Sequence, residues 1–271
     1  MPQANASKEI HLVDSHCHLD MEAFDQDLDL VIDQAHRAGV DTILTIGVDR
    51  ASSEQAVELA GRYPSVYAAV GIHPHDAIGV TDADFDKIVE LSINEKVVGY
   101  GEIGLDYARM YSPKEVQQQV FSRQLGLAKE LHLPVIIHDR EAHEDTLKIL
   151  RSHAPFPAGG VMHCFSGDTE LADRVIELGF FVSIPGIVTF KNAKSLQQVA
   201  QELPLHSMLI ETDGPFLAPV PFRGKRNTPA LLQYTAAKIA RLRDTPLLVI
   251  AERTSDNART LFNLPPAAGT E

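Results

Sequence analysis

The sequence predicts a TIM-type (β/α)8 barrel of the α/β class, on three observations. The chain has 271 residues, and barrels of this kind commonly comprise about 250 residues in one domain. Eight short apolar runs alternate with segments of helical periodicity, which is the pattern of a parallel sheet covered by helices. Ionisable side chains lie at the ends of most of these runs. We expect one domain over residues 8–264, with flexible termini at 1–7 and 265–271.

The eight expected strands are rich in Val, Ile, Leu and aromatic residues and are separated by helical segments. Clear examples of the helical segments are residues 112–132 and 192–203, and a further pair of helices is expected between Pro229 and Phe262. One apolar stripe on the 192–203 helix consists of Ala193, Leu196, Val199, Ala200 and Leu203. The strands, in order, are IHLVDSH (10–16), DTILTIGV (41–48), VYAAVGIH (66–73), VVGYGEIG (97–104), PVIIHDR (134–140), GGVMHCFS (159–166), GFFVSIPG (179–186) and SMLIETDG (207–214).

The composition is that of a globular protein without a membrane segment. Hydrophobic residues make up 44% and charged residues 23%, and no stretch approaches the ~20 apolar residues that span a bilayer. The opening residues MPQANASKEI lack the features of a secretory signal, so we expect a cytoplasmic protein. The two cysteines, Cys17 and Cys164, are interpreted as small buried packing residues. No obligate protein partner is evident.

The formal net charge of −13 argues against a protein that coats duplex DNA with a broad basic surface. A local site for phosphate stays compatible with this charge.

A histidine pair occurs in the motif VDSHCHLD near the start of the chain. If this segment is a strand, His16 and His18 point to one face and Cys17 points to the other. Two imidazoles on one face can chelate a metal. The pair alone is a weak signal, because short histidine pairs also occur by chance on protein surfaces.

Further potential ligands follow the other strands, where the active sites of such barrels lie. Any one of them could be a hydrogen-bonded core residue, a helix cap or a solvated charge. Together they are hard to explain in this way, because buried charges without partners are costly. A metal centre at the C-terminal ends of the strands explains the whole set, which comprises His16, His18, His73, Glu102, His138, His163 and Asp213.

These residues lie in ordered motifs that resemble the TatD family of metal-dependent hydrolases, a branch of the amidohydrolase-like barrels associated with deoxyribonuclease activity. The resemblance runs from about Ile10 to Leu264 through VDSHCHLD, GIHP, GEIGLDY, PVIIHDR, HCFSG, SIPGIVTFKN, IETDGPFLAP and FRGKRNTP. It implies that His16, His18 and Asp213 hold one divalent ion, that His138 and His163 hold a second, and that Glu102 bridges both.

Mixed histidine and carboxylate ligands suit Zn, Mn or Ni and tolerate Mg less readily, so the ligands leave the metal open. The resemblance implies activity with Mg or Mn. A bridging glutamate in place of a modified lysine favours the nuclease branch. Two divalent ions would leave a positive centre that attracts a phosphodiester, and would activate a water for attack. Asp213 could accept the proton of that water.

The predicted function is therefore a deoxyribonuclease, acting as an exonuclease on single strands or frayed ends. Two alternatives remain at this point. The same two metals could hydrolyse an amide or a small phosphoester, because a fold does not fix its chemistry. The chain could also be a non-catalytic scaffold with bound metal.

Candidate substrate contacts are less specific. Arg223, Lys225 and Arg226 follow the last strand and could bind phosphate or form a solvated basic loop. Arg140 shares a strand face with His138 and is a second candidate for phosphate. His73 could donate to a phosphate oxygen or serve a structural role. Two aromatic residues at strand ends, Tyr107 and Phe165, could stack on a base, although packing against the barrel is the favoured use of both.

Overall fold

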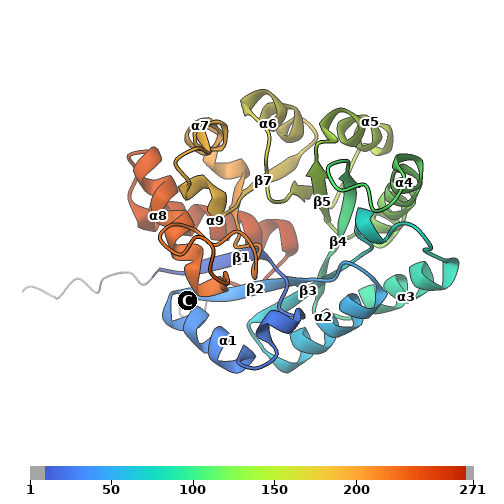
Figure 1. Cartoon of the computed structure of the whole chain (residues 1–271), viewed down its shortest axis with the longest axis horizontal. Helices are drawn as coiled ribbons and strands as arrows, with labels where there is room; N and C mark the ends of the chain where they lie inside the picture. Colours follow the sequence, from blue (N-terminus) through green and yellow to red (C-terminus); the bar gives the residue numbers. More distant parts are fainter. Residues whose placement is uncertain (1–9, 267–271) are drawn as a thin grey trace, which may run out of the picture.

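The computed structural model describes residues 10–266 and confirms the predicted barrel. Eight strands form one parallel sheet in the order β1 to β8, and helices surround it as a ring (Figure 1). The predicted single domain over 8–264 stays a prediction. Residues 1–9 and 267–271, which include most of the predicted flexible termini at 1–7 and 265–271, lie outside the described residues. The strands are β1 (Leu12–Cys17), β2 (Val40–Ile46), β3 (Val66–Val70), β4 (Val97–Asp106), β5 (Val135–Arg140), β6 (Gly160–Met162), β7 (Phe180–Ile184) and β8 (Met208–Ile210).

A helix follows each strand, as expected for right-handed β-α-β connections. Short 3-10 turns, η1 to η5, lie in several of the connecting loops, and η2 (Pro74–Asp76) follows β3 at the centre described below. Two helices close the chain where the sequence predicted them. The helices are α1 (Leu28–Arg37), α2 (Arg50–Arg62), α3 (Asp82–Ser92), α4 (Lys114–Glu130), α5 (His143–His153), α6 (Thr169–Ile176), α7 (Lys194–Glu202), α8 (Leu232–Leu242) and α9 (Leu247–Phe262).

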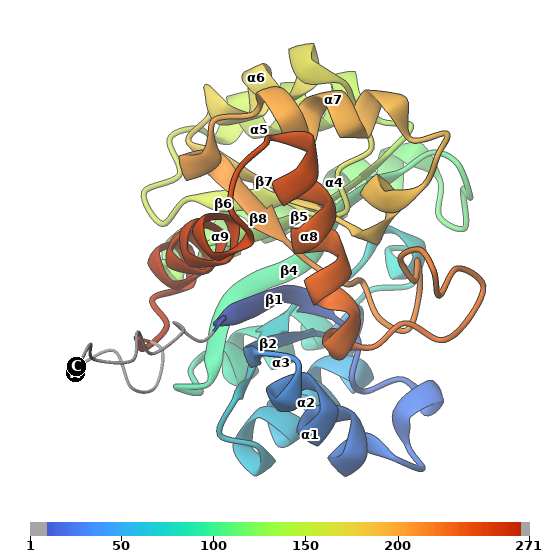
Figure 2. The same ribbon diagram turned by 90° about the vertical axis from the view of Figure 1, so that its left-hand side faces the viewer.

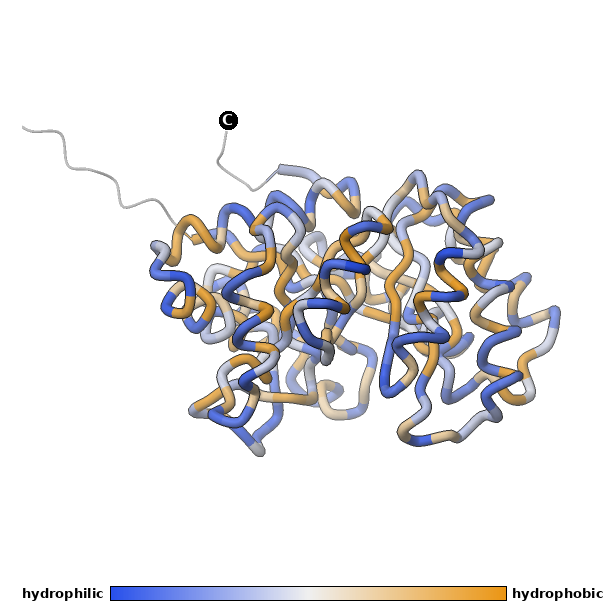
Figure 3. Tube along the Cα trace, turned by 90° about the horizontal axis from the view of Figure 1, so that it is seen from above, coloured by the Kyte–Doolittle hydropathy of each residue, from blue (hydrophilic) through white to orange (hydrophobic). Residues whose placement is uncertain are grey.

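The core has two apolar layers. One lies between the strands and the surrounding helices, and it includes the predicted stripe of α7 at Leu196, Val199 and Ala200. The other consists of residues such as Leu44 and Ile136, which pack with α9 residues that include Phe262. Figure 2 shows α9 lying against β1 and β8, and Figure 3 shows hydrophilic positions on the outer turns of the helices.

The barrel closes where β1 meets the segment after β8. An isolated parallel bridge joins Cys17 to Gly214. The His18 amide donates to the Gly214 carbonyl at 2.7 Å, and the Asp213 amide donates to the His16 carbonyl at 2.9 Å. Closure therefore brings the two histidines of the N-terminal motif beside an aspartate almost two hundred residues later in the chain.

Strand β4 differs from its predicted form. It continues to Asp106 rather than ending at residue 104, so Glu102 lies in the middle of the strand and not at its end. Gly104 adopts a φ of +148°, and a Cβ at this position would lie 1.9 Å from the His138 carbonyl oxygen. Only glycine allows β4 and β5 to approach this closely.

The cysteine interpretation is half correct. Cys17 is buried, whereas Cys164 is only half-buried and has a left-handed backbone, with a φ of +42°. Its position after β6 places its thiol 4.0 Å from an Asp213 oxygen, so it lies at the polar end of the barrel. Within residues 10–266, none of the helices has the length and apolar character needed to cross a bilayer.

Candidate metal centre

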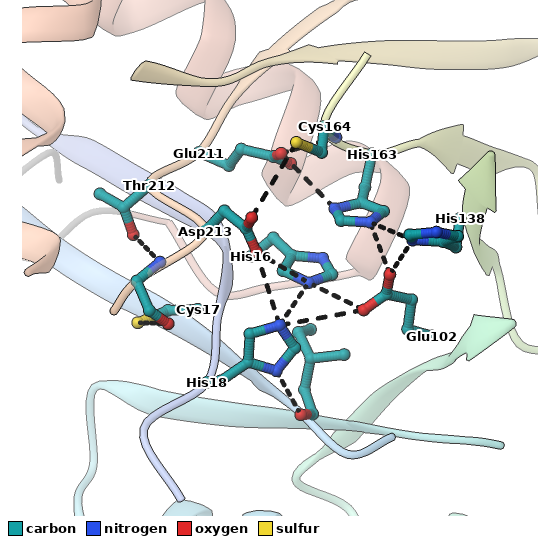
Figure 4. A network of polar contacts seen from close by, with 12 residues as sticks. His16, Cys17, His18, Glu102, His138, His163, Cys164, Glu211, Thr212 and Asp213 are labelled. Carbon is teal, nitrogen blue, oxygen red and sulfur yellow. Dashed lines mark hydrogen bonds and ion pairs between the residues drawn. The ribbon is translucent and has the colours of Figure 1, made fainter. Parts of the chain in front are cut away.

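All seven predicted ligands meet at the C-terminal end of the barrel (Figure 4 shows six of them). They come from six strands or the loops that follow, because parallel strands end on the same side of the sheet. His16 and Glu102 are almost completely buried, and the others are buried or half-buried. The imidazoles of His16 and His18 point to the same side, with their Nε2 atoms 3.3 Å apart, as the strand alternation predicted.

Glu102 lies between two groups of donors and presents one oxygen to each. Its Oε2 lies 3.3 Å from His16 Nε2 and 3.9 Å from His18 Nε2. Its Oε1 lies 2.6 Å from His138 Nδ1 and 2.7 Å from His163 Nε2. A carboxylate divided in this way is able to bridge two cations.

Asp213 completes the first of these groups. Its Oδ1 lies 3.5 Å from His18 Nε2 and 3.9 Å from His16 Nε2. Donor atoms of His16, His18 and Asp213 all lie within 4.8 Å of one another, which is close enough to share one ion. On the other side, the facing nitrogens of His138 and His163 are 3.5 Å apart.

The outer nitrogens of three imidazoles face oxygen acceptors, and for His18 and His138 a hydrogen bond determines where the ring carries its proton. His18 Nδ1 lies 3.1 Å from the Ile46 carbonyl and His138 Nε2 lies 3.2 Å from Asp106 Oδ2, so both must donate. His163 Nδ1 lies 3.5 Å from Glu211 Oε1. The inner nitrogens are then left with lone pairs that face one another and Glu102.

Lone pairs and carboxylate oxygens at these distances repel unless a proton or a metal cation lies between them. The donor set therefore fits divalent cations, since neutral imidazole nitrogens and carboxylate oxygens are their common ligands. The residues present supply donors of this kind, grouped within 4.8 Å of one another.

The electrostatics of the centre favour bound positive charge. Burial would raise the pKa of Glu102, but the surrounding histidines, chiefly His163 and His73, outweigh burial and hold that pKa well below its usual range. Burial would lower the pKa of His18, but the neighbouring Asp213 raises it to about 9. The pKa of His163 is raised well above its ordinary value, because Glu102 and Glu211 oppose the effect of burial.

His73 lies beside the centre and caps the turn η2. Its Nδ1 accepts from the His75 amide at 3.1 Å, so a neutral ring carries its proton on Nε2, which lies 3.5 Å from Glu102 Oε1. Burial and the neighbouring His138 hold the pKa of His73 well below its ordinary value. The ring is thus a neutral donor directed into the centre, and it also has a structural role.

Sequence reasoning missed the carboxylates behind the candidate ligands. Asp106 accepts from His138 and His75 at one oxygen, and from the backbone amides of Ala108 and Arg109 at the other. Glu211 accepts from the Cys164 amide at 2.6 Å. The sequence did contain a sign of these two residues. Both lie in the strand-end motifs GEIGLDY and IETDG, where a carboxylate is expected to be buried and to need hydrogen-bond partners.

A third such carboxylate, Asp14, joins the two segments that close the barrel. It accepts from the Thr212 amide at 2.9 Å and from the Thr212 hydroxyl. The amide of His16 also lies 3.4 Å from one of its oxygens. Asp14 therefore links β1 directly to the segment that carries Asp213.

The predicted phosphate contacts lie at the surface. Arg223 is exposed and its guanidinium lies 4.5 Å from the centre of the Phe190 ring. Lys225 and Arg140 are also exposed. Arg226 is engaged elsewhere, because it pairs with both oxygens of Asp27, at 2.7 and 2.8 Å. It ties the loop after β8 to the start of α1.

Both aromatic residues considered for base stacking pack against the barrel, which is the use that the sequence analysis favoured. Phe165 is buried. The Tyr107 hydroxyl donates to Asp145 at 2.8 Å and accepts from Gln118, while the Lys114 ammonium lies 4.0 Å from the centre of its ring.

An eight-stranded barrel with histidines and carboxylates converging at the strand ends is the architecture of a divalent-metal hydrolase. The particular family follows from sequence. A family model described as "TatD related DNase" matches residues 13–263. The chain belongs to the TatD family of metal-dependent hydrolases, as the motifs predicted.

Individual relatives agree with this assignment. The chain is 47% identical over 253 residues to "Uncharacterized metal-dependent hydrolase YabD" of Bacillus subtilis, which covers 93% of this chain and 99% of the relative. It is 34% identical over 258 residues to "3'-5' ssDNA/RNA exonuclease TatD" of Escherichia fergusonii, with coverage of 93% and 99%. Among solved structures, the TatD homologue YJJV of Escherichia coli superposes with a TM-score of 0.90 at 34% identity, covering 95% of this chain and 100% of that one.

Proposed function

We propose that this hydrolase cleaves phosphodiester bonds of nucleic acids, as an exonuclease on single-stranded or frayed DNA. The observation that carries the proposal is the division of the Glu102 carboxylate between two groups of nitrogen donors, with Oε1 and Oε2 facing different groups. Metal pairs about 3.5–4 Å apart are the usual device of enzymes that break phosphodiesters. The relative named as a 3'-5' exonuclease on single-stranded DNA and RNA supports the same substrate class and suggests the 3' end as the starting point.

In this proposal two divalent ions are held, with Mg, Mn, Zn or Ni as candidates. His16, His18 and Asp213 would hold the first, His138 and His163 would hold the second, and Glu102 would bridge both. When bound, such ions would neutralise the phosphate, activate the attacking water and stabilise the leaving oxygen.

The chain supplies the proton acceptor and the contacts to the substrate. Asp213 accepts the proton of the attacking water. Burial would raise the pKa of its carboxyl, but His18 and His16 hold that pKa below its usual value, so the group stays ionised and free to accept a proton. The Nε2–H group of His73 donates to a phosphate oxygen. The exposed cations Arg223, Lys225 and Arg140 contact phosphates further along the strand.

The decisive experiment is a substrate panel with the full-length protein. Single-stranded and double-stranded oligonucleotides, labelled at either end, are incubated with Mg, Mn or Zn beside N-acyl amides and small phosphoesters. We expect stepwise shortening of the single strands from the 3' end, and a loss of kcat of at least about a hundredfold in Asp213→Asn. Turnover of an amide or a small phosphoester without any cleavage of oligonucleotides would contradict the proposal and favour the alternative hydrolase.

The basic loop is tested separately. Arg223→Ala should weaken oligonucleotide binding and lower the salt dependence of the affinity by about one phosphate contact, without a change in metal content. If Arg223→Ala binds oligonucleotides with the affinity of the wild type at every salt concentration, Arg223 makes no phosphate contact and belongs to a solvated loop.

A further inference from the structure

Exposed apolar side chains gather around the mouth of the barrel. Within residues 10–266, all Phe and Tyr residues are at least half-buried except Tyr111, which is 60% exposed, and Phe216, which is 47% exposed. Both belong to loops that follow strands at the end of the barrel where the candidate ligands meet. Three exposed aliphatic residues share these loops or the neighbouring one, namely Ile78, Met110 and Val220.

The two exposed rings lie on opposite sides of the centre. Tyr111 follows β4 and Phe216 follows β8, and these strands are four places apart in a sheet of eight strands that closes on itself. The Phe216 ring is edge-on to His18, with ring centres 6.2 Å apart. The Tyr111 ring is edge-on to His75 at 4.7 Å, and His75 shares the carboxylate of Asp106 with His138.

The segment that carries each ring is held in place although the ring itself is exposed. The Phe216 amide donates to the Asp213 carbonyl at 2.8 Å, which ties this residue to a candidate ligand. Beside Tyr111, the Ser112 hydroxyl donates to the His75 carbonyl and accepts from the Ile78 amide, both at 2.9 Å. The rings are therefore positioned by the same segments that form the centre.

We propose that Tyr111 and Phe216 are stacking platforms for the unpaired bases on either side of the phosphate at the metal centre. The inference rests on the proposed nuclease function and extends it to the bases. An exposed aromatic ring gains by covering its surface, and every nucleobase offers a flat face whatever its sequence.

The position of the rings argues for bases as their occupant. A phosphate bound at the centre necessarily carries nucleosides on one or both sides, within reach of rings that adjoin His18 and His75. A cation accompanies Tyr111, since Arg109 donates to its hydroxyl at 3.3 Å. A second cation, Arg223, is exposed further along the loop that carries Phe216, with its guanidinium over the Phe190 ring. In a duplex the bases already stack on each other, so such platforms select single strands and frayed ends.

The test compares variants that remove a ring with variants that keep one. Tyr111→Leu and Phe216→Leu remove the rings, Tyr111→Phe and Phe216→Tyr keep them, and Ile93→Ala is the control because Ile93 is 78% exposed at the end of α3, outside the barrel mouth. Each is assayed with added Mn on two oligonucleotides of equal length, one normal and one with abasic sites at the three terminal nucleotides. Metal per chain is measured in parallel.

We expect each leucine variant to raise KM for the normal oligonucleotide about five- to fiftyfold and to narrow the preference for normal over abasic substrate. The ring-keeping variants should restore most of that preference, and Ile93→Ala should match the wild type. Equal losses on both substrates, or a changed metal content, would overturn the stacking role. An altered oligomeric state in the leucine variants would assign the rings to a protein contact and would also overturn it.

The outcome separates this inference from the function on which it rests. If the wild type cleaves neither oligonucleotide, the proposed function fails and the inference fails with it. If the wild type cleaves and the leucine variants keep its preference, only the stacking inference fails.

Discussion

At the scale of single residues, the site depends on which atom of each side chain faces inward. His18, His138 and His163 each turn one nitrogen to an acceptor and the other to the centre. Without these acceptors an imidazole could present either a proton or a lone pair. The outer partners therefore determine whether the histidines can serve as ligands.

The assignment of Glu102 to both ions predicts different losses in two variants. His163→Ala should lose one ion preferentially, because His163 Nε2 lies 2.7 Å from Glu102 Oε1, the oxygen that also faces His138. Glu102→Ala removes negative charge from between two cations, so it should deplete both ions and lower activity by at least about a hundredfold. Elemental analysis of the purified variants, as metal per chain beside the wild type, distinguishes them. Two retained ions with near-normal activity in Glu102→Ala would show that the bridge is misassigned.

Asp106 offers a test of the outer partners. Four donors point at its two oxygens, two at each, and an asparagine would turn an amide group toward one pair of them. Asp106→Asn should weaken metal binding about 10- to 100-fold in a calorimetric titration. Asp139→Asn is the matched control, because this buried neighbour of His138 accepts instead from His143 at 2.7 Å. Equal affinities in the two variants would contradict a specific role for Asp106.

At the scale of elements, β4 and β5 position two of the candidate ligands beside each other. Glu102 is on β4, His138 is on β5, and the two strands pair directly with Gly104 opposite His138. Because these backbones approach closely, the Glu102 and His138 side chains come within 2.6 Å of each other. The strands thus act as one rigid support for the candidate bridge.

Gly104→Ala should disrupt this support. The new methyl group would overlap the His138 carbonyl oxygen, and the φ of +148° is unfavourable for alanine. We expect a loss of at least about 3 kcal/mol in the free energy of unfolding, measured with urea on the metal-free protein.

Gly126→Ala is the control for this substitution. Gly126 lies inside α4, and a Cβ there meets no other group within 4 Å. We expect it to stabilise the protein by about 0.5–1 kcal/mol, as alanine does in a helix. Similar effects of the two substitutions would show that β4 and β5 tolerate separation.

At the scale of the whole molecule, the barrel gathers acidic groups at one end of an already acidic chain with a net charge of −13. The chain gains stability from any cation that binds the folded centre and not the unfolded chain. Metal binding and folding are therefore linked.

Removal of metal should abolish hydrolysis and lower the unfolding temperature, and added divalent metal should restore both. At a free metal concentration of a hundred times Kd, one site stabilises the fold by about 2.7 kcal/mol. Scanning calorimetry of chelated and reloaded samples measures the shift. Identical unfolding curves together with full activity after thorough chelation would rule out a metal-dependent mechanism.

The sequence by itself determined the order of the elements. Alternation of apolar runs and helical stripes is a local pattern, so it predicted eight strands and located long helices such as α4 and α7 to within a few residues. The candidate ligands were also readable, because parallel strands place their ends on one side and the motifs have a recognisable order. The cytoplasmic location and the roles of the individual ligands stay predictions.

Only the tertiary structure decided which atoms meet. The extension of β4 past Glu102, the pairing of Asp106 with His138, and the exposure of Tyr111 and Phe216 depend on strands and loops that are distant in sequence. Local patterns carry no information on such contacts. Distances between side chains from different strands follow from the register and closure of the barrel, and these are properties of the whole sheet.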